Sequence, residues 1–246
     1  MNILSSIILF ICLSLNSLFS QNVNFEKVEK ELILEFENYI NSDYDTRYNS
    51  LRPKLKKKIE TVLEIPESFT YNFDSLSKYV TIIQSNDNKV KMFSWDELTG
   101  GSWHDMAVIV QFKTKTQKIK TQWIDSDISE EVSGLTDAVQ YEINDVIIDN
   151  KVHYLCFGRG TYGSGHHHNS ILIFSIENGT IQPCNSCILE NHATIQAPRR
   201  DKINLSYDKE KQEISFNEFK YNDDIGFFES TGKQIRLKLK NGKFSE

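Results

Sequence analysis

The sequence predicts a mainly β protein, an antiparallel meander preceded by an N-terminal two-helix hairpin. Between residues 25 and 62, apolar side chains recur every three or four positions, which places them on one face of an α-helix. Beyond about residue 70, apolar and polar residues alternate, as in strands with one packed face and one wet face. We therefore expect a signal peptide at 1–20, a helical hairpin at 21–66 and an antiparallel β domain at 67–246.

The first twenty residues have the character of an export signal. They carry no charged side chain, and the stretch from Ile3 to Leu15 is mostly apolar. This stretch is shorter than the ~20 residues of a membrane-spanning helix, so we interpret it as a cleaved signal with Gln21 as the first mature residue. An uncleaved N-terminal anchor is the alternative. No second long apolar run follows, so we expect a soluble periplasmic or extracellular protein with no membrane span after cleavage.

Composition excludes several classes of protein. The chain has 28 Lys and Arg against 34 Asp and Glu, a net charge of -6, and both signs are interspersed. A nucleic-acid partner is therefore not expected. With 39% hydrophobic and 25% charged residues, the chain resembles neither a disordered protein nor a polytopic membrane protein.

Two apolar stripes predict the two helices. The first consists of Phe25, Val28, Leu32, Phe36 and Tyr39, and the second of Tyr48, Leu51, Leu55, Ile59 and Val62. Pro53 lacks a backbone N–H, so it fits the first turn of a helix with Ser50 as its N-cap. Asn41-Ser42-Asp43 predicts the turn between the helices.

Turn signals divide the rest of the chain into about ten short strands. They lie at Asn86-Asp87-Asn88, Asp149-Asn150, Asn178-Gly179, Asp208-Lys209 and Asn241-Gly242. The continuously apolar runs at 107–110 and 171–174 predict central strands that are buried on both faces. Short links between strands favour a meander that closes as a barrel, a sandwich or an incomplete propeller.

The loop at 94–105 is the first candidate site. It contains Trp95, Asp96, Trp103, His104 and Asp105. Exposed tryptophan beside carboxylates suits the stacking and hydrogen bonding of a sugar ring. Asp96 or Glu97 with Asp105 also fits the acid/base pair of a glycosidase. The alternative is an ordinary folded loop in which Trp95 packs inward.

The glycine-rich segment at 158–168 is the second candidate site. Gly158, Gly160 and Gly163 match the spacing of a dinucleotide-binding loop, but a strand follows instead of the required helix, so we reject that interpretation. Tyr162, His166 and His168 remain as candidate ligand-binding residues. In an extended segment the two imidazoles point the same way, as a metal site requires. A flexible polar hairpin loop with partly exposed histidines is the alternative.

The pair Cys184 and Cys187 predicts a local disulfide in an oxidising compartment. Zinc is the alternative cofactor, held by Cys184, Cys187 and His192 with His166 or His168 as the fourth ligand. We expect hairpin pairing to bring His166 and His168 within ~10 Å of the disulfide segment, which is also what the zinc alternative requires. Without zinc, we expect no cofactor. A further cysteine, Cys156, lies in a predicted strand as a buried free thiol.

Two classes of function remain open. We expect an exported, non-catalytic binding or surface-interaction protein that uses loops 94–105 and 158–168, because no nucleophile motif, phosphate loop or complete metal signature is present. Its partner is unknown, with a carbohydrate or a component of the cell envelope as candidates. The alternative is a secreted hydrolase with a carboxylate site or a His/Cys metal site.

Overall fold

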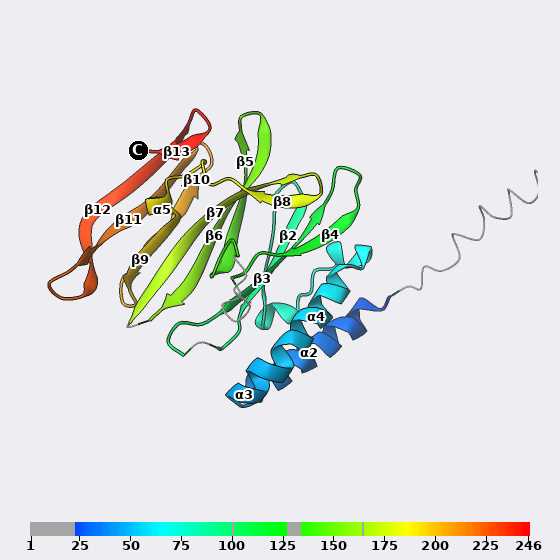
Figure 1. The fold of residues 1–246 in the computed structure, drawn as a ribbon. Coiled ribbons are helices and arrows are strands. Elements are labelled where there is room, and N and C mark those ends of the chain that lie inside the picture. The colour runs from blue at the N-terminus through cyan, green and yellow to red at the C-terminus, as the bar shows by residue number, and fades with distance from the viewer. Residues whose placement is uncertain (1–22, 100, 127–133, 164) are drawn as a thin grey trace, which may run out of the picture.

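The computed structural model describes residues 23–99, 101–126, 134–163 and 165–246, without the side chain of Tyr162. The expected signal peptide at 1–20 lies outside the described residues. In the described part, helices near the N-terminus are followed by three antiparallel sheets, so the predicted mainly β class is confirmed (Figure 1). None of the described helices combines the length and the apolar character that crossing a membrane requires.

The helices form an almost continuous helical segment broken once. Helix α2 (Phe25–Asn41) begins at Asn24, whose side chain accepts a hydrogen bond from the Lys27 N–H. The short α3 (Tyr44–Thr46), a π-helical turn (Arg47–Leu51) and α4 (Arg52–Leu63) follow.

Ser50 is therefore not the N-cap of the second helix, because the chain is already helical from Tyr44. Pro53 does lie in the first turn of α4. Since proline cannot donate to the preceding turn, the wider π-helical turn just before it accommodates the missing hydrogen bond.

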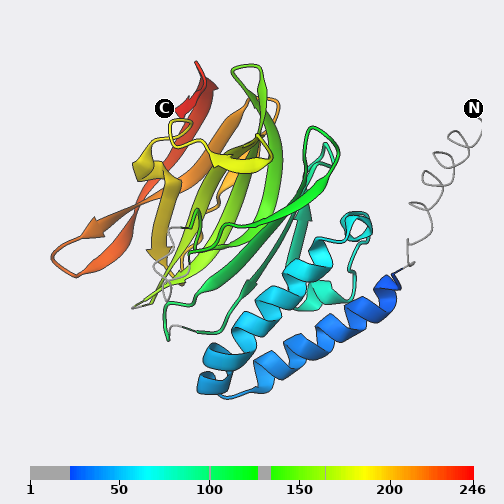
Figure 2. The same cartoon turned by 45° about the vertical axis from the view of Figure 1, so that its right-hand side comes forward.

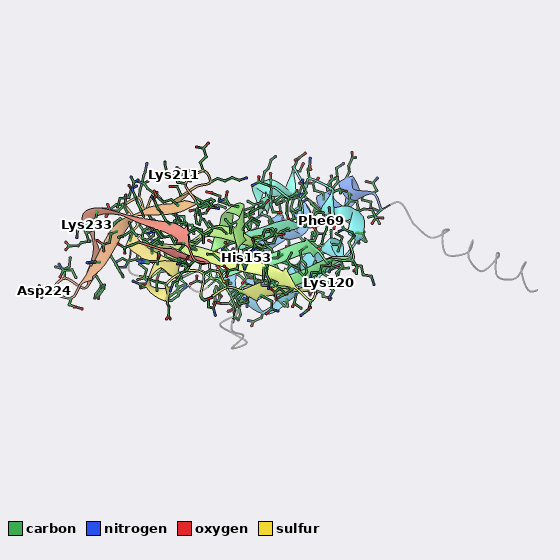
Figure 3. The ribbon with its side chains drawn as sticks, turned by 90° about the horizontal axis from the view of Figure 1, so that it is seen from above. Phe69, Lys120, His153, Lys211, Asp224 and Lys233 are labelled. Carbon is green, nitrogen blue, oxygen red and sulfur yellow. A yellow bond between two sulfur atoms is a disulfide. The ribbon has the colours of Figure 1, made fainter. Side chains whose placement is uncertain are left out.

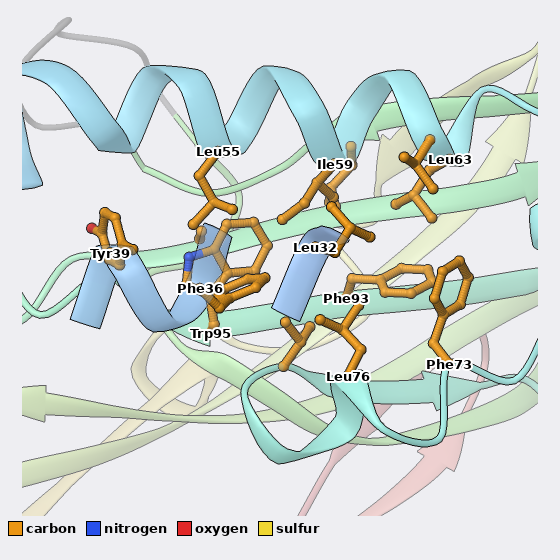
Figure 4. Close-up of a cluster of buried hydrophobic side chains, with 14 of the residues drawn as sticks. Leu32, Phe36, Tyr39, Leu55, Ile59, Leu63, Phe73, Leu76, Phe93 and Trp95 are labelled. Carbon is orange, nitrogen blue, oxygen red and sulfur yellow. The ribbon is translucent and has the colours of Figure 1, made fainter. Parts of the chain in front are cut away.

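Most residues of both predicted apolar stripes are buried in one core, which we call the helix-facing core (Figure 4). Val28 and Leu51 are partly buried against it, and Tyr48 lies outside it. Leu32 and Phe36 of α2 meet Leu55 of α4, and all three are at most 3% exposed. From below, Trp95 packs edge-to-face on Phe36, with ring centroids 5.6 Å apart. Trp95 is only 3% exposed, so the expectation that it offers an exposed stacking surface is wrong, and its inward packing is the observed alternative.

Apart from β9 (Thr194–Pro198), the strands of each sheet follow chain order. The first sheet contains β1 (Thr81–Gln84), β2 (Val90–Asp96), β3 (Met106–Lys113) and β4 (Ile119–Trp123). The middle sheet contains β5 (Val139–Ile148), β6 (Lys151–Tyr162), β7 (His166–Glu177) and β8 (Thr180–Pro183). After the short α5 (Glu190–Ala193), β9 also pairs with β7. The third contains β10 (Ser206–Asp208), β11 (Glu213–Asn222), β12 (Phe227–Lys240) and β13 (Lys243–Ser245).

Two further cores join the sheets face to face. Val110 of the first sheet packs in one core with Cys156 and Phe174 of the middle sheet. On the opposite face of the middle sheet, Leu155 and Ile173 pack with residues of the third sheet. The middle sheet is therefore buried on both faces, which confirms the expectation for 171–174, and Figure 2 shows the helices on the far side of the first sheet.

Three of the predicted turns have a backbone geometry that favours the residues found there. Asp149-Asn150, Asn178-Gly179 and Asn241-Gly242 each link two antiparallel strands, and all six residues have φ between 48° and 78°. Asparagine, aspartate and glycine tolerate this left-handed region better than other residues, which is why these pairs predict hairpins.

Candidate functional site

The two loops singled out from the sequence contact each other at one end of the middle sheet. The backbone N–H of His104 donates to Thr161 Oγ1 at 2.7 Å. Arg199, just after β9, joins both segments: its backbone N–H donates to Gly165 O at 2.9 Å, and its guanidinium donates to Ser102 O at 3.2 Å. These residues therefore form one surface assembled from three separate parts of the chain.

Asp96 and His104 form a hydrogen-bonded pair within this surface. His104 Nδ1 lies 2.6 Å from Asp96 Oδ2, and the second oxygen of Asp96 accepts the backbone N–H of Leu98 at 2.7 Å. Both side chains are about one-third exposed, and the neighbouring Trp103 is 38% exposed. A carboxylate that holds an imidazole in this way fixes its orientation and tautomer.

The predicted acid/base partnership of Glu97 with Asp105 is wrong. Glu97 is 1% exposed and forms an ion pair with Arg52 of α4 at 2.7 Å. Burial raises the pKa of Glu97 even though the hydrogen bond from Arg52 opposes the shift. Asp105 instead accepts a hydrogen bond from Thr99 at 2.8 Å. Glu97 is thus a structural charge that anchors the helices to the loop.

The segment at 158–168 is mostly strand, not a flexible loop, because β6 extends to Tyr162 and β7 begins at His166. Its glycines have a packing role. A Cβ atom at Gly160 would lie 2.4 Å from the His168 ring, and one at Gly158 would lie 2.4 Å from the Gln140 side chain. The glycine spacing therefore reflects close contact across the sheet rather than a phosphate-binding loop.

The three consecutive histidines are buried and have three different partners. His166 packs on Phe227, with ring centroids 3.8 Å apart. His167 Nε2 lies 3.0 Å from Asp201 O, and His168 Nε2 lies 3.0 Å from Asp137 Oδ1. The expectation of partly exposed histidines is therefore wrong, since their exposed fractions are 4%, 7% and 1%.

The predicted disulfide between Cys184 and Cys187 is present, and Cys156 is the predicted buried free thiol. The imidazoles expected beside the disulfide lie elsewhere. The Cys184 N–H donates a hydrogen bond to Ile173 O on β7. Ile173 is five residues from His168, which corresponds to about 16 Å along a strand. His192 faces Glu246.

A different histidine meets the cysteine pair. One imidazole nitrogen of His153 and the sulfurs of Cys184 and Cys187 all lie within 4.8 Å of one another. Sequence reasoning missed His153 because this residue is distant from the cysteines in the chain, and only the folding of β6 into the middle sheet brings it beside them.

A basic cleft of about 710 Å³ opens beside the loop surface. We use this name for the space lined by Val139, Tyr141, Arg159, His167, Asn169, Arg199, Arg200, Asp201, Lys202, Ile203, Asn204 and Leu205. The lining contains four cationic residues and one carboxylate, although the chain as a whole has a net charge of -6. Neither Arg159 nor Lys202 forms an ion pair with any residue that the structure describes. The cleft therefore concentrates positive charge on an acidic protein.

The wall of the basic cleft also offers neutral hydrogen-bonding groups. Asn169 Nδ2 donates to Tyr141 Oη at 2.8 Å. Burial raises the pKa of Tyr141 to about 12, so this phenol is neutral at physiological pH. Burial also lowers the pKa of His167, which keeps its imidazole neutral. Charged and neutral donors side by side suit a ligand that carries both an anionic group and hydroxyls.

Most residues of the basic cleft escaped sequence reasoning. The available signal was the cluster Arg199-Arg200-Asp201-Lys202 directly after a strand. Whether this cluster lies beside Arg159 depends on the pairing of β6 with β7 and of β7 with β9, which a single stretch of sequence does not show.

No protein-family model matches this chain, and no curated protein sequence matches it significantly.

Proposed function

We propose that this protein is an exported, non-catalytic binding protein that holds an acidic carbohydrate in the basic cleft. The observation that carries this proposal is that Arg159 and Lys202, both exposed and without an ion-pair partner among the described residues, line a cleft of a net-acidic chain. A negatively charged ligand would supply the missing counter-charge. The volume of about 710 Å³ lies within the range of small-ligand sites.

Neutral groups in the cleft favour a sugar over a simple anion. Tyr141 and Asn169 present hydroxyl and amide groups next to the cations, and a uronic acid or a sulfated sugar carries hydroxyls beside its charge. Arg199 lines the cleft and also bonds to Ser102 in the loop of 94–105. A longer oligosaccharide would therefore extend towards Trp103, whose indole is 38% exposed and suited to stacking on a sugar ring.

Calorimetric titration tests this function. The mature protein is titrated with an oligogalacturonate, a sulfated oligosaccharide and a neutral oligosaccharide of equal length. We expect binding of one or both acidic sugars, none of the neutral one, and weakening as salt increases. Arg159→Ala and Lys202→Ala should each lower the affinity about tenfold, because a hydrogen bond to a charged group contributes about 1.5–3 kcal/mol.

The matched control is Arg236→Ala. Arg236 is an exposed arginine on β12 that pairs with Glu213 and does not line the cleft. It should bind like the wild type. Equal binding of inorganic sulfate and of the acidic sugars would contradict carbohydrate recognition, and an unchanged affinity in both cleft variants would place the ligand elsewhere.

Export is part of the same proposal and rests on the uncharged stretch 1–20. The Cys184–Cys187 disulfide supports it, because disulfides persist in oxidising compartments. N-terminal sequencing of the protein from a periplasmic or culture fraction should begin at Gln21. Full-length protein retained in the membrane fraction would contradict cleavage.

A secreted hydrolase is the second candidate function, and the Asp96–His104 pair favours it. An imidazole oriented by a carboxylate is the arrangement of a general base. Incubation of the protein with the same oligosaccharides should then release shorter products, and His104→Ala should abolish their release. Intact oligosaccharides after prolonged incubation would exclude this candidate.

A further inference from the structure

Three potential metal ligands from separate parts of the middle sheet meet beside the third sheet. His153 lies near the start of β6, whereas Cys184 and Cys187 follow β8. One ligand atom from each lies within 4.8 Å of the other two, and both His153 and Cys187 are buried. Figure 3 shows His153 in the central part of the elongated molecule, remote from the end marked by Asp224 and Lys233.

Backbone hydrogen bonds hold both cysteines independently of the disulfide. The Cys184 N–H donates to Ile173 O on β7 at 2.8 Å, and the Phe244 N–H on β13 donates to Cys187 O at 2.8 Å. A turn bond from Cys187 N–H to Cys184 O at 3.1 Å links the two residues. Since neighbouring strands fix these positions, with the Cα atoms 5.4 Å apart, the two sulfurs should stay close together after the disulfide is reduced.

A hydrogen bond to the backbone defines the tautomer of His153. Its Nδ1 lies 3.2 Å from the backbone oxygen of Lys151, which can only accept a hydrogen bond. Nδ1 therefore carries the proton, and the lone pair is on Nε2. Metal-binding histidines are commonly held in one tautomer by such a bond from the second ring nitrogen to a carbonyl.

We propose that Cys184, Cys187 and His153 form a redox-controlled zinc site. In the oxidised protein the disulfide excludes the metal, because zinc binds thiolates. A dithiol reductant supplies two electrons and two protons, which break the S–S bond and yield two thiols while the reductant becomes a disulfide. Zinc then displaces both thiol protons and takes two sulfur ligands, one imidazole nitrogen and a solvent molecule as its fourth ligand. The sulfur and imidazole donor set favours zinc over calcium or magnesium.

Metal titration of the full mature chain tests this site. The protein is reduced with a phosphine under anaerobic conditions, freed of reductant and titrated with Zn²⁺ against a chromophoric chelator. We expect one equivalent bound by the reduced protein and none by the oxidised protein. Co²⁺ as a probe should give the absorption of thiolate-to-metal charge transfer in the reduced protein only.

Matched variants assign the ligands. Cys184→Ser should abolish binding, and His153→Gln should weaken it at least tenfold. The control is His192→Gln, since His192 is a histidine of similar burial that faces Glu246. It should bind zinc like the wild type. Far-UV circular dichroism of each variant verifies that it remains folded.

The proposal has three results that would overturn it. The first is that the reduced, folded wild type binds no zinc, and the second is that the oxidised protein binds zinc equally well. The third is that the wild type unfolds on reduction, which would contradict the anchoring of the cysteines by β7 and β13. An unchanged affinity in folded His153→Gln would remove His153 from the site.

Discussion

Single buried charges tie separate layers of this molecule together. The Glu97–Arg52 ion pair, with both side chains at most 6% exposed, connects the end of β2 to α4. Lys91 on the same strand is 3% exposed, lies near the rings of Phe73 and Phe93, and donates to the backbone oxygen of Tyr71. Because a buried charge is expensive unless it is paired, each of these residues has a measurable effect on stability.

Removing Glu97 should destabilise the protein strongly. Glu97→Ala leaves the Arg52 guanidinium buried without its carboxylate, so the free energy of unfolding should fall by about 3–5 kcal/mol in urea denaturation. The double variant Glu97→Met/Arg52→Met removes both charges and should recover much of this loss. A cost below about 1 kcal/mol for Glu97→Ala would show that the pair is solvated, as exposed pairs are.

Lys91 should make stability depend on alkaline pH. Burial lowers its pKa to about 8, whereas an unfolded lysine titrates at about 10.4. Between these values the unfolded chain holds a proton that the folded chain has released, so the free energy of unfolding rises with pH. The wild type should therefore gain stability relative to Lys91→Met as the pH increases from about 8 to about 10. Urea denaturation at several pH values measures this, and a constant difference would contradict the low pKa.

At the scale of elements, the helices are held by their apolar stripes. Leu32 of α2 and Leu55 of α4 share the helix-facing core with Phe93 and Trp95 of the first sheet. The third turn of α2 also exposes Leu34 on its opposite face, so one helix offers both a buried and an exposed leucine. Packing against the sheet, more than helix propensity, should stabilise these segments.

Truncating the buried leucines should cost far more than truncating the exposed one. Leu32→Ala and Leu55→Ala should each lower the free energy of unfolding by roughly 2–4 kcal/mol, since they lose burial and leave a cavity. Leu34→Ala is the matched control, because Leu34 is 63% exposed and should change stability by less than about 0.5 kcal/mol. Equal costs for all three would mean that the helices do not depend on the sheet.

At the scale of the whole molecule, the sheets share their cores. Strand β3 contributes Ile109 to the helix-facing core and Val110 to the core between the first and middle sheets. Likewise β6 contributes Leu155 and Cys156 to opposite faces of the middle sheet. Neither sheet can therefore separate without exposing apolar surface that belongs to two layers.

This sharing predicts cooperative unfolding. Trp95 and Trp123 contact each other near α4, with ring centroids 5.9 Å apart, so tryptophan fluorescence reports mainly on the helix-facing end of the molecule. Far-UV circular dichroism reports on all three sheets. The two signals should give coincident urea transitions. A fluorescence transition at lower urea would show that the helices and the first sheet unfold as a separate unit.

Local patterns in the sequence were sufficient for the elements. The two apolar stripes that contain Leu32 and Leu55 predict helical faces, and pairs such as Asn178-Gly179 predict hairpins, because both patterns depend on backbone geometry within a few residues. The Cys184–Cys187 disulfide is equally local, since only two residues separate the cysteines. The sequence by itself therefore determined the mainly β class, the turns and the disulfide.

Tertiary structure alone decided how strands associate and what they bring together. Register places Gly160 against His168 and buries a segment that resembles a glycine-rich loop. It also carries His153 to Cys184, and Arg159 to the segment around Lys202. The last two contacts join residues tens of positions apart, and their partners follow from the packing of whole sheets. The periodicity of a single strand contains no information about which strand lies beside it, so the basic cleft and the proposed metal site emerge only in the folded chain.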